Sequence, residues 1–90
     1  MKATRVFYEG FVQGVGFRWT TKYLAKGYDV SGWVRNLRDG RVELQVRGEE
    51  QEVAGFLRAI RESTLGGHIS AEHTEEIEIP TPFKGFRIVS

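Results

Sequence analysis

The sequence contains no cysteine and only two histidines among its 90 residues. The absence of cysteine excludes disulfide frameworks, cysteine zinc sites, thiol nucleophiles and dithiol redox motifs. With His68 and His73 as the only histidines, a histidine-rich metal site is not expected either. No apolar run exceeds three residues, so no membrane span is predicted, and the N-terminus lacks the apolar stretch of a signal peptide. We therefore expect a cytoplasmic protein.

Charge and composition are those of an ordinary globular domain. The 13 lysines and arginines are balanced by 12 acidic residues, and the net charge is +1. Nucleic-acid-binding domains usually carry a strong basic excess, so this balance argues against such a partner. A chain of 90 residues that is 40% hydrophobic can bury one modest core. We expect residues 1–90 to form a single domain, and a monomer.

Hydrophobic periodicity predicts an alternation of strands and helices. Apolar residues alternate where strands are expected and recur at i, i+3, i+4 and i+7 where helices are expected. Asp39 and Gly40 mark a hairpin turn, and Gly27 is expected to end the first helix in the left-handed conformation. The predicted elements are a strand over Thr4–Phe11, a helix over Phe17–Lys26, a hairpin of Val30–Asn36 and Val42–Arg47, a helix over Glu50–Glu62, a strand that ends at Ile79, and a short terminal strand over Phe86–Val89.

The last third of the sequence is less regular. Ile77 and Ile79 alternate, but the same parity carried backwards would bury Glu75 and His73. Either a β-bulge interrupts this strand or the strand begins late. The order of elements predicts an α+β fold, a ferredoxin-like βαββαβ sandwich. In this fold two helices cover one face of an antiparallel sheet, here with a short C-terminal strand added.

The segment from Gln13 to Arg18 is the first candidate for a binding site. Consecutive backbone N–H groups in a turn with Gly14 and Gly16, followed by the start of a helix, can form a cradle for an anion. Arg18 would add a guanidinium suited to phosphate or carboxylate. The dinucleotide pattern fails because Trp19 stands at its third glycine, and no Gly-Lys-Ser/Thr follows for a P-loop. On spacing alone, the segment is either this cradle or a tight turn with a solvated arginine.

Asn36 is the second candidate, because it lies where a strand enters a turn. On its own it is either a turn residue or a functional one. In the predicted fold the first and second strands are parallel with one strand between them. Their carboxyl ends then lie at the same edge, about 10 Å apart. Arg18 and Asn36 are therefore expected to face a common pocket.

Two longer motifs resemble the signatures of the acylphosphatase family. Residues 10–18 read Gly-Phe-Val-Gln-Gly-Val-Gly-Phe-Arg and resemble the first signature. Residues 32–42 read Gly-Trp-Val-Arg-Asn-Leu-Arg-Asp-Gly-Arg-Val and resemble the second. The element order and residues 85–89 are also similar, so the resemblance covers essentially the whole chain. Tyr8 and Phe11 depart from it, since the family usually has an aliphatic residue at the first position and frequently a basic one at the second.

The resemblance implies a metal-independent hydrolase, without cofactors, that splits acyl phosphates into a carboxylate and inorganic phosphate. It implies that Arg18 pairs with the phosphoryl charge and that Asn36 orients the attacking water. The chemistry agrees, because a carboxylate whose conjugate acid has a pKa near about 4 departs without a general acid. Positioning and charge stabilisation can then supply most of the catalysis. The phosphoryl oxygens are expected to contact the backbone amides of Gln13, Gly14, Val15, Gly16, Phe17 and Arg18.

Two other classes of function are weighed against this one. The first is a non-catalytic module that binds acyl phosphate or phosphate, since similar domains occur within larger carbamoyl-transfer proteins. The second is a small RNA-binding domain, which needs exposed aromatic residues on the central strands, and Tyr8 and Leu44 do not provide that pattern. Trp19 and Trp33 could border a substrate, although partial burial in a core is the commoner use of tryptophan.

Overall fold

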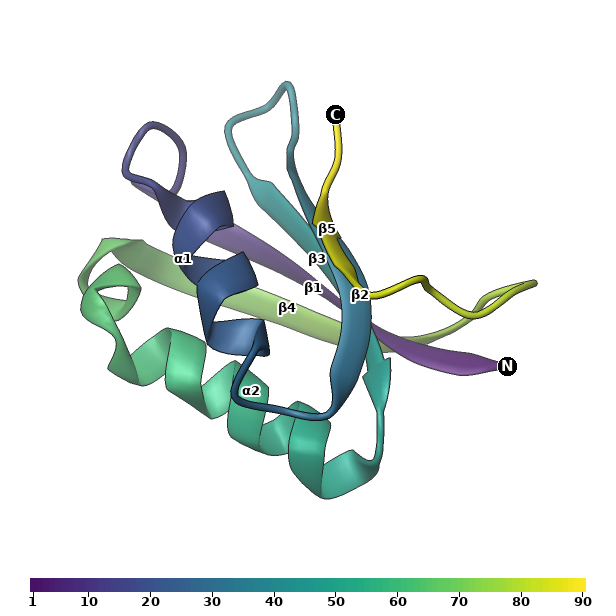
Figure 1. Cartoon of the computed structure of the whole chain (residues 1–90). Coiled ribbons are helices and arrows are strands. Elements are labelled where there is room, and N and C mark those ends of the chain that lie inside the picture. Colours follow the sequence, from purple (N-terminus) through teal and green to yellow (C-terminus); the bar gives the residue numbers. More distant parts are fainter.

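Five strands form one sheet, and both α-helices cover the same face of it. The computed structural model describes residues 1–90. The strand order is β4-β1-β3-β2-β5, with α1 and α2 packed side by side on the sheet (Figure 1). The predicted ferredoxin-like α+β fold is confirmed. The elements in order are β1 (Lys2–Gly10), α1 (Phe17–Ala25), β2 (Val30–Asn36), β3 (Val42–Gly48), α2 (Glu50–Glu62), the 3-10 helix η1 (Thr64–His68), β4 (Ile69–Glu78) and β5 (Phe86–Ile88).

The position of β3 sets the geometry of the candidate site. β3 lies between β1 and β2 and is antiparallel to both. β1 and β2 are therefore parallel, and their carboxyl ends meet at one edge of the sheet, as predicted. Figure 1 shows the loop after β1 and the turn after β2 at this same edge. The short terminal strand β5 pairs with β2 in parallel, so the complete sheet is mixed.

The two helices begin and end for different reasons. α2 has the predicted bounds and carries Glu50 and Glu52 in its first turn, where acidic side chains complement the helix dipole. Backbone hydrogen bonds between residues three apart close the end of α1. In one of them the Gly27 N–H donates to the Leu24 carbonyl over 3.0 Å. The prediction of a left-handed Gly27 is wrong, because Gly27 is not one of the glycines with a positive φ.

β4 shows that both predictions for the last third were wrong. It starts at Ile69, which is early rather than late, and its pairing with β1 shifts register only at its start, opposite Gly10. His73, Glu75 and Ile77 share one side of the strand, and that side is the face of the sheet without helices. The two polar side chains are therefore exposed, and no bulge is needed to keep them out of the core.

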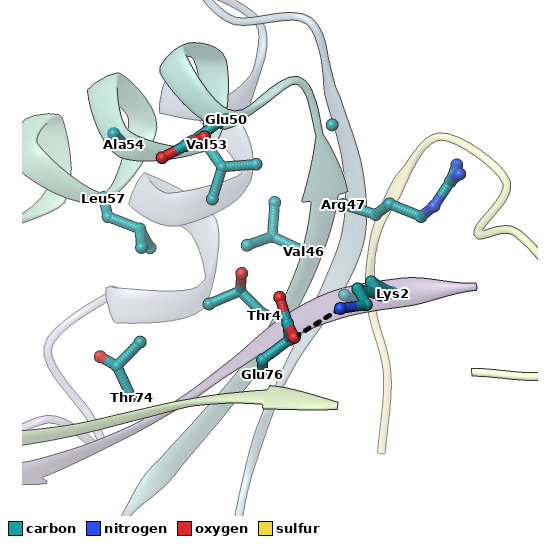
Figure 2. Close-up of a pocket in the computed structure, with 12 residues that line it drawn as sticks. Lys2, Thr4, Val46, Arg47, Glu50, Val53, Ala54, Leu57, Thr74 and Glu76 are labelled. Atoms are coloured by element: carbon teal, nitrogen blue, oxygen red, sulfur yellow. Dashed lines mark hydrogen bonds and ion pairs between the residues drawn. The ribbon is translucent and has the colours of Figure 1, made fainter. Parts of the chain in front are cut away.

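A groove separates α2 from the edge strand β4 (Figure 2). Its volume is about 510 Å³, and Val53 and Leu57 of α2 line it together with Val46 of β3. An ion pair of 3.1 Å between Lys2 and Glu76 lies at its border. Because the groove includes the first residues of β1, it opens at the edge of the sheet opposite to the carboxyl ends of β1 and β2.

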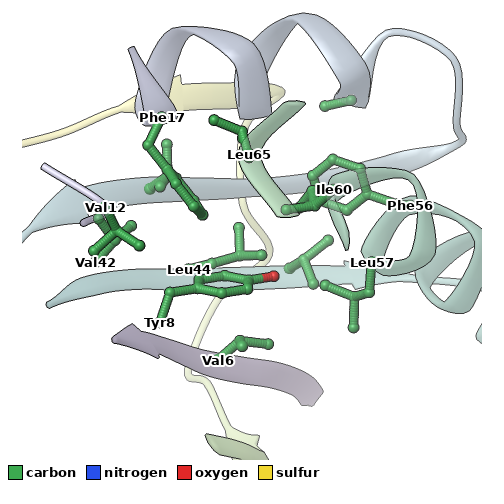
Figure 3. Packing of buried hydrophobic residues seen from close by; sticks show 13 residues of the cluster. Val6, Tyr8, Val12, Phe17, Val42, Leu44, Phe56, Leu57, Ile60 and Leu65 are labelled. Atoms are coloured by element: carbon green, nitrogen blue, oxygen red, sulfur yellow. The ribbon is translucent and has the colours of Figure 1, made fainter. Parts of the chain in front are cut away.

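The core fills the space between the sheet and the helices (Figure 3). Alternate residues of the central strands point toward α2, whose largest core side chain is Phe56. Tyr8 is fully buried in this layer, and its hydroxyl has no hydrogen-bond partner. Burial, with a smaller effect from the Glu72 carboxylate, raises the pKa of the Tyr8 phenol. This aromatic departure from the expected aliphatic residue therefore leaves a polar atom unsatisfied in the core.

Replacing Tyr8 with phenylalanine is expected to stabilise the protein. Tyr8→Phe keeps the packed ring and removes the unpartnered hydroxyl, which should raise the free energy of unfolding by about 1 kcal/mol. Urea unfolding measures this difference. Tyr28→Phe is the matched control, because Tyr28 is only half-buried, and its effect should stay within about 0.5 kcal/mol. A loss of stability in Tyr8→Phe would show that the hydroxyl has a partner after all.

Candidate functional site

The backbone from Gln13 to Arg18 leaves six consecutive N–H groups without an acceptor in the protein. The next bonded N–H in this stretch is that of Thr20, which donates to the Gly16 carbonyl over 3.0 Å. Gly14 and Gly16 have φ values of +80° and +76°, and no residue other than glycine has a positive φ. Val15 therefore lies between two residues of positive φ, and alternation in the sign of φ is a feature of backbone turns whose successive N–H groups form one concavity. The segment from Gln13 to Arg18 therefore has the free backbone donors that the predicted cradle requires.

Helix α1 adds positive potential at the end of this cradle. Its N-cap residue, Gly16, offers no side-chain cap, and its first turn contains no acidic residue. Arg18 stands in that turn instead, half-exposed, and takes part in none of the ion pairs that hold other arginines, such as Arg35 with Glu43. The helix dipole and an unpaired guanidinium thus act together, and both favour an anion.

The side chain of Gln13 ties the cradle to the β2–β3 hairpin. Its Nε2 donates to the Leu37 carbonyl over 2.7 Å and to the Arg41 carbonyl over 2.9 Å. Both amide hydrogens are thereby used, and the backbone N–H of Gln13 remains free for a ligand. This bridging role was missed in the sequence, because its partners are backbone carbonyls 24 and 28 residues away.

Asn36 ends β2 on the core side of the sheet, opposite Val42 of β3. Its Oδ1 is buried and has no hydrogen-bond partner. The turn is held by other groups, since the Leu37 N–H donates to the Arg41 carbonyl over 2.8 Å and the Asp39 carboxylate accepts from the N–H and Nε of Arg41. These bonds lower the pKa of Asp39 below its ordinary value. The Asn36 amide oxygen therefore takes no part in the hydrogen bonds that stabilise the turn.

The Gln13 bridge brings the two candidate segments together. It ends at Leu37, the residue directly after Asn36, so the cradle and the strand end that carries Asn36 are in hydrogen-bond contact. Phe17 can offer only its backbone to a ligand, because its side chain is 2% exposed and its ring lies 5.0 Å from that of Tyr8. The 510 Å³ groove beside α2 includes none of the predicted site residues.

The remaining candidates fall outside this site. His68 and His73 are exposed, and His73 contacts the Glu9 carboxylate over 2.8 Å. No group of three or more histidine, cysteine, aspartate or glutamate side chains could hold a metal ion. No helix is long and apolar enough to cross a bilayer. Trp33 is half-buried, whereas the expectation of burial is wrong for Trp19, which is 69% exposed.

The face of the sheet without helices is the one that an RNA could reach, and neither Tyr8 nor Leu44 lies on it. Tyr8 and Leu44 are both buried in the core beneath the helices. The opposite face of the sheet carries the ring of Phe7, which lies under the guanidinium groups of Arg5 and Arg41 at 5.2 and 4.6 Å. Each of these arginines is also paired with an acidic side chain. The protein's own cations thus already occupy this aromatic ring.

Comparison with known proteins gives a consistent picture. The family model for acylphosphatase matches residues 4–88. An acylphosphatase of Geobacillus thermodenitrificans is 39% identical over 89 residues, which cover 99% of this chain and 95% of that protein. The crystal structure of the Bacillus subtilis acylphosphatase superposes over the full length of both chains with a TM-score of 0.88 at 31% identity. HypF of T. kodakarensis also matches the full chain, with a TM-score of 0.88 at 29% identity, over 12% of its own length.

Gln13→Glu is expected to separate the cradle from the hairpin. The variant keeps the shape of the side chain, but at neutral pH a carboxylate cannot donate to the two carbonyl oxygens and is repelled by them. The free energy of unfolding should fall by about 2 kcal/mol, as measured in urea. Gln51→Glu makes the same chemical change at an exposed position of α2 and should shift stability by less than about 0.5 kcal/mol. Equal stability of the two variants would mean that the Gln13 bridge contributes nothing.

Proposed function

Because this chain belongs to the acylphosphatase family, we propose that it hydrolyses acyl phosphates with the cradle of residues 13–18 as its phosphate site and Asn36 as the residue that aligns water. Acylphosphatases are hydrolases, and the substrate class, an acyl phosphate, follows from the family. The assignment of roles to individual residues is the proposal.

One observation carries this assignment: six neighbouring N–H groups have no acceptor, and an arginine without an ion pair lies at their end. Most of these donors belong to exposed or half-exposed residues that a ligand can reach, and a phosphoryl group supplies several acceptor oxygens at once. In the proposed complex the N–H groups contact the non-bridging oxygens. The Arg18 guanidinium neutralises their charge as it becomes redistributed in the transition state.

The reaction requires little from the protein beyond this positioning. The water oxygen forms a bond to phosphorus while the bond between phosphorus and the acyl oxygen breaks, and the carboxylate leaves with that electron pair. A carboxylate is stable without a proton at neutral pH, so no general acid is needed. The Asn36 Oδ1 has no partner in the protein, and once a rotation of the side chain exposes this buried oxygen, it can accept a hydrogen bond from the attacking water and fix its direction. Inorganic phosphate and a carboxylate are the products.

Arg18→Ala should abolish turnover and weaken the binding of phosphate together. The assay is release of phosphate from benzoyl phosphate in the presence of EDTA, with inorganic phosphate tested as a competitive inhibitor. We expect the unmodified enzyme to remain active in EDTA, and Arg18→Ala to lose at least about a hundredfold in kcat/KM. Arg58→Ala, an exposed arginine of α2 without an ion pair, is the matched control and should keep full activity. A fully active Arg18→Ala variant would place the phosphate site elsewhere.

Asn36→Ala should change kcat rather than KM. An interaction with the attacking water is made in the transition state, so its loss should lower kcat by about a hundredfold while KM stays nearly constant. Steady-state kinetics on the same substrate measure both constants, and a urea unfolding curve shows whether the variant is folded. An unchanged kcat would remove Asn36 from the mechanism. A rise in KM alone would assign it to substrate binding instead.

A further inference from the structure

Exposed apolar side chains gather around the cradle. The chain has five large hydrophobic side chains that are exposed, and four of them lie between residues 11 and 23. They are Phe11, Val15, Trp19 and Tyr23, and Phe11 and Trp19 are 84% and 69% exposed. Burial of such a side chain contributes about 1.5–3 kcal/mol. These four side chains are exposed, so they do not add this amount to the stability of the fold.

Three of these residues bracket the free N–H groups. Phe11 directly follows β1 and precedes the cradle, Val15 lies inside it between the two left-handed glycines, and Trp19 directly follows Arg18 in the first turn of α1. We call Phe11, Val15 and Trp19 the apolar rim. Tyr23 lies four residues further along α1, about 6 Å from Trp19 at 1.5 Å of rise per residue. It is therefore one helical turn further from the cradle.

The chemistry of an acyl phosphate directs its carbon skeleton to this rim. Its non-bridging phosphoryl oxygens can contact the cradle, but the bridging oxygen carries the acyl group and must leave room for it. The acyl group therefore emerges from the mouth of the cradle. Along the chain, Phe11 precedes the cradle and Trp19 follows it. No acidic or basic side chain belongs to the rim. The Lys22 ammonium lies 5.7 Å from the centre of the Trp19 ring.

We propose that the apolar rim binds the acyl group, and that the enzyme prefers acyl phosphates with an aromatic or cyclic apolar acyl group over small ones such as acetyl phosphate. This inference rests on the proposed function, since it needs the phosphoryl group in the cradle. Trp19 and Phe11 supply flat apolar surfaces, and contact of such a surface with a substrate ring is favourable by burial and by offset stacking. The backbone then recognises the phosphate, and the side chains of the rim select the acyl group.

The test compares two substrates in three variants. Values of kcat/KM are measured for acetyl phosphate and for benzoyl phosphate in the unmodified enzyme, Trp19→Ala, Phe11→Ala and Tyr23→Ala. The quantity of interest is the benzoyl-to-acetyl ratio relative to that of the unmodified enzyme, because the intrinsic reactivity of each substrate cancels. We expect this ratio to fall about tenfold in Trp19→Ala and by a similar factor in Phe11→Ala.

Tyr23→Ala is the matched control. Tyr23 is 70% exposed, lies on the same helix and has Lys26 over its ring at 5.8 Å, just as Lys22 lies over Trp19. Its removal should leave the ratio unchanged. All three side chains are exposed, so urea unfolding midpoints should agree with that of the unmodified enzyme.

Other outcomes overturn the inference in recognisable ways. An unchanged ratio in Trp19→Ala and Phe11→Ala, with both substrates still hydrolysed, would overturn the rim but leave the proposed function standing. An equal fall of the ratio in Tyr23→Ala would overturn it as well. The effect on selectivity would then not depend on how close a side chain of α1 lies to the cradle. If the unmodified enzyme hydrolyses neither substrate, the proposed function itself fails.

Discussion

The two hydrogen bonds that the Gln13 amide donates hold the site together. The cradle uses its own backbone N–H groups for no internal bond, and two of its residues are glycines, so no hydrogen bond donated by its backbone fixes the conformation of residues 13–16. The bonds to the carbonyls of Leu37 and Arg41 fasten it to a hairpin that is itself closed by the Asp39 carboxylate. A binding site made of backbone donors is effective only if those donors are already in place before the ligand arrives. The Gln13 side chain provides that order while leaving the donors free.

The sheet makes this short contact possible. β3 separates β1 from β2, so the two strands run in parallel and end at the same edge, one with the cradle and the other with Asn36. α1 starts at that edge and returns along the sheet, which sets its positive end and Arg18 at the site. The groove beside α2 opens at the opposite edge. That groove contains none of the residues proposed to bind phosphate, so the proposal rests on the unpaired backbone donors of the cradle and not on the volume of a cavity.

The sequence predicted the elements whose periodicity has one interpretation. The bounds of α2 and β2 were correct, and β3 extends only one residue beyond its predicted end, because these elements have a regular apolar repeat and the Asp39–Gly40 turn is recognisable. β4 was misread because its parity was assumed to face the core, although a strand at the edge of a one-sided sheet can carry charged residues such as Glu75 on its open face. The cradle was found through local chemistry. The role of the Gln13 side chain was not, since it depends on a contact between segments that only the folded sheet brings together.

In the proposed site the backbone binds the phosphate and exposed side chains bind the acyl group, and this separation has a physical consequence. In the proposed mode of binding the backbone N–H groups contact the phosphate, so within the cradle only the side chains of Gln13 and Arg18 and the two glycines with positive φ are constrained by phosphate recognition. Exposed residues such as Phe11 and Trp19 contribute nothing to the core, and the fold places no constraint on their identity. In the proposed complex the phosphoryl group, which all acyl phosphates share, contacts the backbone, and the acyl group, which differs between them, contacts exposed side chains. Selectivity can change in such an arrangement without any change in the phosphate site or in stability.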